Sequence, residues 1–198
     1  MKVIVHEMPS GVAISHLNRR LIAKMVGPGF GWGKDRIDRE AAKAPQGKKT
    51  KLRPYYLALA HGGLTEDQAV ELIRLKDDPA GCLSCRVIDD SELPAEQALR
   101  GVEPTFRDAW EDTGTAVQVN MPKAQVIHME RIREVRNAEL AKLDVPYMKA
   151  LEAGDPVEQQ RIAAPKQALR DIPQTFDLSG FGTPEELTAA WPGELLKA

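Results

Sequence analysis

The chain has 198 residues, of which 42% are hydrophobic and 28% charged, and this balance excludes a disordered chain or a fibrous repeat. Its formal net charge of −2 excludes a charge-driven attraction of the whole molecule to nucleic acid or anionic membranes. No stretch approaches the roughly 18 apolar residues that cross a bilayer, and residues 1–11 lack the apolar core of a signal peptide. We therefore expect no membrane partner. Having only two cysteines, Cys82 and Cys85, favours a reducing, intracellular compartment.

The N-terminal residues predict a β-hairpin followed by a short helix. Residues 2–7 and 12–14 place valine and isoleucine at alternate positions, and residues 8–11 contain a proline and a glycine that suit a turn. Asn18 can cap a helix whose apolar side chains recur at helical spacing and which stops at Gly27.

Residues 27–60 are expected to form a Gly-rich, basic inserted arm, because most of this segment follows neither a helical nor a strand period. Its closely spaced glycines suggest a phosphate-binding loop, but the spacing does not fit. A Walker loop would need glycine at the position of Pro28 and serine or threonine at the position of Asp35. The dinucleotide-binding fingerprint would need glycine at the position of Trp32. We interpret the glycine-rich stretch as a flexible or partner-docking loop.

A helix and a strand are predicted after the arm. Thr65 and Gln68 form a capping box, in which each side chain can hydrogen-bond the backbone amide of the other residue. The helix that starts there stops at the turn-forming residues 77–81. Residues 82–88 then alternate as a strand, and residues 91–104 have the composition of a linker.

The C-terminal half predicts a strand at 116–120 and then a long helix from Pro122 to about Leu143. One face of this helix is expected to hold Ala124, Ile127, Val135 and Ala138, flanked by Ile132 and Leu143.

Two further helices complete the predicted elements. Asp155 can cap the first of them. Pro165 should kink or break this helix, since an interior proline removes a hydrogen bond at a cost of about 3 kcal/mol. Thr183 and Glu186 form the capping box of a short final helix.

These elements predict an α+β fold: an N-terminal β-hairpin or small antiparallel sheet with short helices, followed by a C-terminal α-helical hairpin. We expect two domains. Residues 1–104 form a small α+β domain that carries the basic arm at 27–60, and residues 105–198 form a mainly helical domain.

No catalytic, metal or cofactor site is predicted, and we expect a protein without enzymatic activity. Cys82 and Cys85 are spaced like half a zinc site or a redox pair, but a strand over 82–88 would point them to opposite faces. The four histidines show no helical metal motif: His6, His16, His61 and His128. An enzyme whose groups assemble from distant positions stays an open alternative.

The most unusual segment is the stretch from Lys34 to Arg53, which has eight basic and three acidic residues, a net charge of +5 that leaves −7 for the remainder. Four aromatic residues flank it. The candidate partner-binding residues are Phe30, Trp32, Lys34, Arg36, Arg39, Lys48, Lys49, Lys51, Arg53, Tyr55 and Tyr56. Two interpretations stand: a basic arm that contacts an acidic partner or only solvent, and a nucleic-acid site with stacked bases and paired phosphates. The chain's overall charge favours the first.

From about Pro104 onward the sequence resembles a group of small proteins of tailed bacteriophages and prophages, often encoded near tail genes. The likeness rests on these residues: Phe106-Arg107-Asp108-Ala109-Trp110, Met121-Pro122-Lys123-Ala124, Ile127-His128, Leu143-Asp144, Tyr147-Met148, Gly154-Asp155, Lys166-Gln167-Ala168-Leu169-Arg170-Asp171 and Thr183-Pro184-Glu185-Glu186-Leu187. The stretch 166–173 is also similar to the C-terminal region of phage tail-fibre assembly chaperones, although Pro165 departs from the helix former expected there.

The resemblance implies a tail-associated phage protein that binds other phage structural proteins, either as a minor virion component or as a tail or tail-fibre assembly chaperone. It implies a location in the host cytoplasm or the virion, and a homo-oligomer is compatible with it. It supplies no active-site residues. The alternative is a nucleic-acid-binding accessory protein that uses the segment 30–56.

Overall fold

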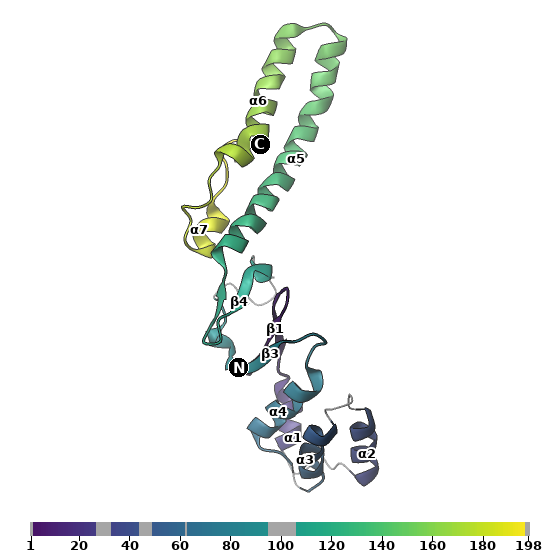
Figure 1. The fold of residues 1–198 in the computed structure, drawn as a ribbon. Coiled ribbons are helices and arrows are strands. Elements are labelled where there is room, and N and C mark those ends of the chain that lie inside the picture. The colour runs from purple at the N-terminus through teal and green to yellow at the C-terminus, as the bar shows by residue number, and fades with distance from the viewer. Residues whose placement is uncertain (1, 27–32, 44–48, 62, 95–105, 197–198) are drawn as a thin grey trace. The chain divides into compact units, whose positions relative to one another are not determined.

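The computed structural model describes residues 2–26, 33–43, 49–61, 63–94 and 106–196 (Figure 1). The fold is α+β, with a small antiparallel sheet and several helices before a C-terminal helical region, as predicted. The chain divides into two compact units. One unit comprises residues 1–95 with 111–117, and the other comprises residues 96–110 with 118–198. The predicted boundary at 104 and most of the predicted linker lie outside the described residues.

The first unit is built on a three-stranded antiparallel sheet with the strand order β2-β1-β3. The N-terminal hairpin is confirmed as β1 (Lys2–Met8) and β2 (Gly11–His16), and β3 (Ser84–Asp89) pairs with the other edge of β1. As the central strand, β1 buries four consecutive residues, 3–6, at 0% exposure. Both faces of β1 are therefore covered.

Helices α1 (Arg19–Val26) and α4 (Glu66–Asp77) form where the sequence predicts them. The Asn18 side chain accepts hydrogen bonds from the first amides of α1. At the start of α4 the Thr65 hydroxyl accepts from the Gln68 amide at 3.2 Å, and Gln68 Oε1 accepts from the Thr65 amide at 2.9 Å. These two local signals fix where each helix begins, and both helices contribute to one hydrophobic core with Ile4 of β1.

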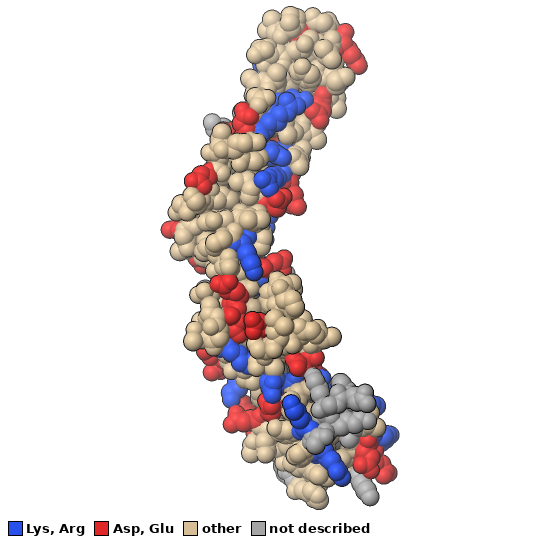
Figure 2. Space-filling model, in the orientation of Figure 1, with Lys and Arg blue, Asp and Glu red and all other residues tan. Residues whose placement is uncertain are grey.

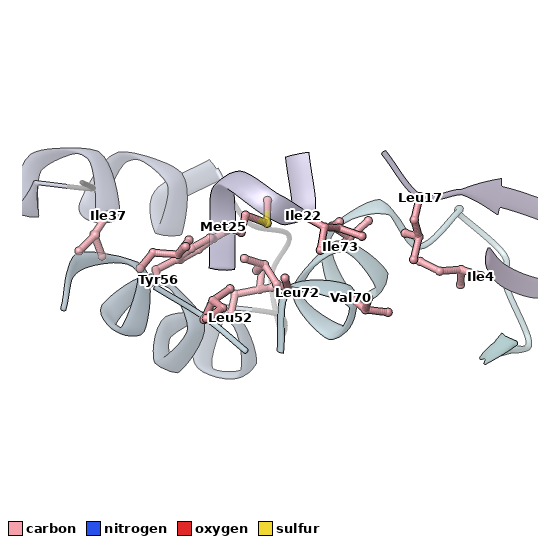
Figure 3. Packing of buried hydrophobic residues seen from close by; sticks show 13 residues of the cluster. Ile4, Leu17, Ile22, Met25, Ile37, Leu52, Tyr56, Val70, Leu72 and Ile73 are labelled. Carbon is pink, nitrogen blue, oxygen red and sulfur yellow. The ribbon is translucent and has the colours of Figure 1, made fainter. Parts of the chain in front are cut away.

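The predicted inserted arm is wrong for residues 34–43 and 49–60, which form the helices α2 (Lys34–Lys43) and α3 (Lys49–Ala60). Both helices contribute to the same hydrophobic core as α1 and α4 (Figure 3). Their buried side chains are Ile37 from α2 and Leu52, Tyr56 and Leu59 from α3. The glycine-rich loop at 27–32 lies outside the described residues.

The sequence pattern missed these helices for two physical reasons. Apart from alanines, α2 has one apolar residue, Ile37, so its pattern carries almost no period. In α3, Pro54 stands inside the helix and interrupts a pattern of buried residues that is otherwise helical. Burial of large side chains in a shared core outweighs these weak local preferences.

A bidentate ion pair links Arg86 of β3 to Asp112, which ends a strand of a second, two-stranded sheet. This sheet consists of β4 (Trp110–Asp112) and β5 (Val117–Val119). Arg86 Nε and Nη2 donate to the carboxylate of Asp112 at 2.8–3.1 Å. The Gly114 amide donates to the same carboxylate at 2.9 Å, and the Asp112 side chain is only 6% exposed. The donors hold the pKa of Asp112 below its ordinary value of 3.8.

The second unit is dominated by the helical hairpin of α5 (Met121–Glu152) and α6 (Pro156–Thr175), followed by α7 (Pro184–Ala189) (Figure 1). The predicted caps at Asp155 and Thr183 are present. The core of this unit includes Phe106, Ala124, Ile132, Leu169, Ile172 and Leu187. Among the described residues, no helix is both long and apolar enough to cross a membrane.

The predicted end and buried face of α5 are corrected by the structure. The helix continues through Pro146 to Glu152, and Val135 and Ala138 are exposed. Its buried residues are Ala124, His128, Ile132 and Ala150. His128 can join this face because its Nε2 donates to the carbonyl oxygen of Ala190 at 2.7 Å.

The predicted break at Pro165 is absent, because α6 is continuous across this residue. Packing anchors the helix on both sides of the proline, with Ile162 before it and Lys166 after it. The Lys166 ammonium is 2.6 Å from the Asp144 carboxylate and 4.8 Å from the centre of the Tyr147 ring, so it has partners on α5. These contacts offset the missing hydrogen bond.

We expect Ile132→Ala to lower the free energy of unfolding by about 2–5 kcal/mol, because this side chain is fully buried and its loss leaves a cavity in the core. Urea denaturation followed by circular dichroism measures the effect. Val126→Ala on the same helix is the control, since Val126 is 63% exposed and should change stability by less than about 0.5 kcal/mol. Equal losses in the two variants would contradict this packing.

We expect Asp112→Asn to lower the free energy of unfolding by on the order of 3 kcal/mol at neutral pH, because it leaves Arg86 without its charged partner. The folded-state pKa of Asp112 is depressed, so this stabilisation is complete above its ordinary pKa of 3.8 and is lost as the pH falls through that value and below. Urea midpoints of both proteins measured across this pH range should converge in acid. Lys2→Gln, which breaks an exposed pair with Asp67, is the control and should show no comparable loss.

Candidate functional site

The predicted partner-binding residues are only partly brought together. Phe30, Trp32 and Lys48 lie outside the described residues. For Lys34 and Lys49 the structure describes only the backbone, which is helical. The exposed cations that remain are Arg36, Arg39, Lys51 and Arg53. They lie on α2 and α3, which pack against each other. The structure thus presents these cations on two helices in place of an arm.

The charge on α2 is nearly balanced, because this helix has four basic and three acidic residues. The Lys43 ammonium lies 3.1 Å from the Glu40 carboxylate, and this hydrogen bond lowers the pKa of Glu40. The excess positive charge of the segment is therefore contributed by α3 and the residues just before it.

The two tyrosines of α3 differ in their availability to a partner. Tyr56 is 2% exposed in the hydrophobic core, where desolvation raises the pKa of its hydroxyl, so its expected role in partner binding is corrected. Tyr55 lines a groove of about 550 Å³ between α3 and α4, together with Lys51 and Arg74. Arg74 is held there by the carboxylate of Glu71 at 2.5 Å. The groove combines one aromatic ring with two cations and one acid.

A second groove, of about 450 Å³, lies on the helical hairpin between α5 and α6. Its apolar lining comes from Leu143, Pro165, Ala168 and Leu169. Its charged lining comes from Glu139, Lys142 and Glu194. An apolar strip with charged neighbours suits the apolar face of an amphipathic helix.

Apolar side chains are also exposed at the end of the hairpin where α5 meets α6. Val145, Met148 and Leu151 recur at three-residue intervals on the last turns of α5, and Val157 lies in the first turn of α6. Their exposure ranges from 49% to 79%. Figure 2 shows this end of the hairpin as mostly uncharged. Contiguous exposed apolar side chains of this kind mark protein interaction sites.

A compact polar cluster lies in the first unit, where the loop after α4 meets β1. His6 of β1 is 0% exposed, while Asp78 and Cys82, from the loop between α4 and β3, are partly exposed. His6 Nδ1 is 3.6 Å from Asp78 Oδ1 and 3.9 Å from Cys82 Sγ, and the three ligand atoms all lie within 4.8 Å of one another. His6 Nε2 is 3.0 Å from the hydroxyl of Ser15 on β2.

This geometry does not match a nucleophilic relay. In a cysteine–histidine–carboxylate relay, the thiol and the carboxylate contact opposite nitrogens of the imidazole. Here Asp78 and Cys82 both approach Nδ1, and Ser15 occupies the other nitrogen. Desolvation, with a contribution from Asp78, raises the pKa of Cys82 to about 11, and its thiol donates to the Ser84 carbonyl oxygen at 3.0 Å. The three side chains converge on one point and do not form a proton path.

Sequence reasoning missed this cluster because it considered Cys82 only together with Cys85. The strand begins at Ser84, so Cys82 lies in the preceding loop and folds back on His6. Cys85 instead contacts the guanidinium of Arg74, with Sγ 2.8 Å from Nη1. The sequence signal that could have found the cluster is the polar His6, which directly follows three apolar residues, 3–5, of the central strand.

Comparison with known protein families, with curated proteins and with solved structures gives no match for this chain.

Proposed function

We propose that the chain is a non-enzymatic protein of tailed bacteriophages that binds other phage structural proteins, as a minor virion component or as a tail or tail-fibre assembly chaperone. Support comes from the resemblance, which begins at about residue 104 and falls mainly on the helical hairpin and α7, with its first segment, 106–110, preceding the hairpin. Its expected location is the host cytoplasm or the virion.

The observation that carries the proposal is the groove between α5 and α6. It is lined by four apolar residues, and two of them, Pro165 and Ala168, are exposed and accessible to a partner. An amphipathic helix of another phage protein can place its apolar residues on this strip while its polar face stays in water. The apolar end of the hairpin at Val145 and Met148 adds a second surface on the same helices.

We expect Ala168→Glu to abolish co-purification of tail proteins with this chain from an infected-cell lysate, because a carboxylate in the apolar groove would be desolvated by the partner. Ala164→Glu is the matched control, since Ala164 is exposed on the same helix but does not line the groove. Both variants should keep the wild-type circular dichroism spectrum.

Mass spectrometry of purified virions separates the two roles within this proposal. A fixed copy number per particle identifies a virion component, and absence from virions with abundance in the lysate identifies a chaperone. Retention of all tail proteins by the Ala168→Glu variant would reject the groove as the partner site.

The second candidate is a nucleic-acid-binding accessory protein, favoured by the groove between α3 and α4. Lys51 could neutralise a phosphate there, and Tyr55 offers a half-buried ring for base stacking, whereas Arg74 is already paired with Glu71. The exposed Arg53 on α3 adds a cation. The burial of Tyr56 removes one of the aromatic residues on which this candidate rested.

The nucleic-acid candidate predicts binding of single-stranded DNA that weakens steeply with salt. Replacing Lys51 and Arg53 together by glutamine should reduce the slope of log K against log salt by about 1–2, because each lost phosphate contact removes roughly one released counterion. Fluorescence anisotropy of a labelled oligonucleotide measures it. Lys24→Gln on α1, an exposed cation outside this groove, should leave the slope unchanged, and absence of salt-dependent binding to the wild type would eliminate the candidate.

A further inference from the structure

The cluster of His6, Asp78 and Cys82 has the composition of a site for a borderline-soft divalent cation. It offers one imidazole nitrogen, one thiol sulfur and one carboxylate oxygen. Thiolate, imidazole and carboxylate together are the ligands that Zn²⁺ takes in proteins, whereas Mg²⁺ and Ca²⁺ prefer oxygen ligands alone. The ligand types therefore select for Zn²⁺ and related transition metals.

The distances fit a common centre. Nitrogen, oxygen and sulfur ligands lie at about 2.0–2.3 Å from Zn²⁺, so two ligands at the tetrahedral angle are about 3.3–3.6 Å apart. The observed separations from His6 Nδ1 are 3.6 Å to Asp78 Oδ1 and 3.9 Å to Cys82 Sγ. The carboxylate oxygen and the sulfur lie within 4.8 Å of each other, and an ion would draw these two loop residues toward a common centre.

The surroundings orient the buried ligand. His6 lies on the central strand with its side chain fully buried, so the imidazole has little freedom. The Ser15 hydroxyl can accept the Nε2 proton at 3.0 Å, which leaves the lone pair of Nδ1 directed toward Asp78 and Cys82. Histidine ligands of metals commonly have such an outer partner that fixes the tautomer.

We propose that His6, Asp78 and Cys82 bind one Zn²⁺-class cation, with water as the fourth ligand. The ion would link the loop between α4 and β3 to the central strand β1, across 76 positions of the sequence. Ser15 acts as a positioning residue through His6. This site belongs to the first unit and is independent of the groove on the helical hairpin.

The test uses Co²⁺ as the probe with the full chain, reduced and freed of metal by a chelator. We expect one Co²⁺ per chain, with the thiolate-to-cobalt charge-transfer absorption and the intense visible bands of a tetrahedral site, and displacement by Zn²⁺. Cys82→Ser should lose the charge-transfer absorption. Cys85→Ser is the matched control and should keep it, because Cys85 lies three residues after Cys82 but contacts Arg74.

Two further variants avoid the buried histidine, whose replacement could prevent folding. Asp78→Asn should weaken Co²⁺ binding, and Ser15→Ala should raise its Kd by about 10–100-fold while one Co²⁺ still binds. Absence of stoichiometric binding to the wild type would overturn the proposal, as would an unchanged spectrum of Cys82→Ser or a lost one in Cys85→Ser. None of these outcomes depends on the protein partner of the hairpin.

Discussion

The first unit depends on the burial of β1 on both of its faces. Ile4 joins the core formed with the helices, and Val3 and Val5, which alternate with it, are equally buried on the opposite face. Arg86 pairs with Val5 between β1 and β3, so its side chain lies on the same face of the sheet as Val5. The ion pair between Arg86 and Asp112 therefore forms on that face. The outer strands β2 and β3 pair with this one strand, and Ile4 and His6 from its helix-facing side contribute to the core and to the polar cluster.

Elements with a local capping signal could be predicted from the sequence, and elements held by tertiary packing could not. The caps at Asn18, Thr65, Asp155 and Thr183 each fixed a helix start correctly, because the interactions involve residues within three positions. The helix α2 has no such cap and one large apolar residue, and α5 buries a histidine that a hydrophobic pattern treats as polar. In both cases the deciding contact comes from a distant segment.

The candidate sites also differ in whether they depend on neighbouring residues or on contacts between distant segments. The basic segment was visible in the sequence because its charges are adjacent, but the burial of Tyr56 depends on how α3 packs. The cluster at Cys82 gives only a weak signal in the sequence, a histidine after an apolar run, because its ligands are brought together by the antiparallel pairing of the first and third strands. A short spacing motif would have been detected, whereas ligands from two distant segments carry no motif at all.

The assignment of residues 111–117 to the first unit affects how the protein folds during synthesis. Domains generally fold as units while the chain leaves the ribosome, beginning from the N-terminus. The first 95 residues supply all three strands of the main sheet, yet Arg86 lacks its carboxylate until Asp112 has emerged. An arrested nascent chain that exposes only those residues would thus hold an incomplete unit. Folding of the N-terminal unit would be completed only when the ribosome has begun to release the second.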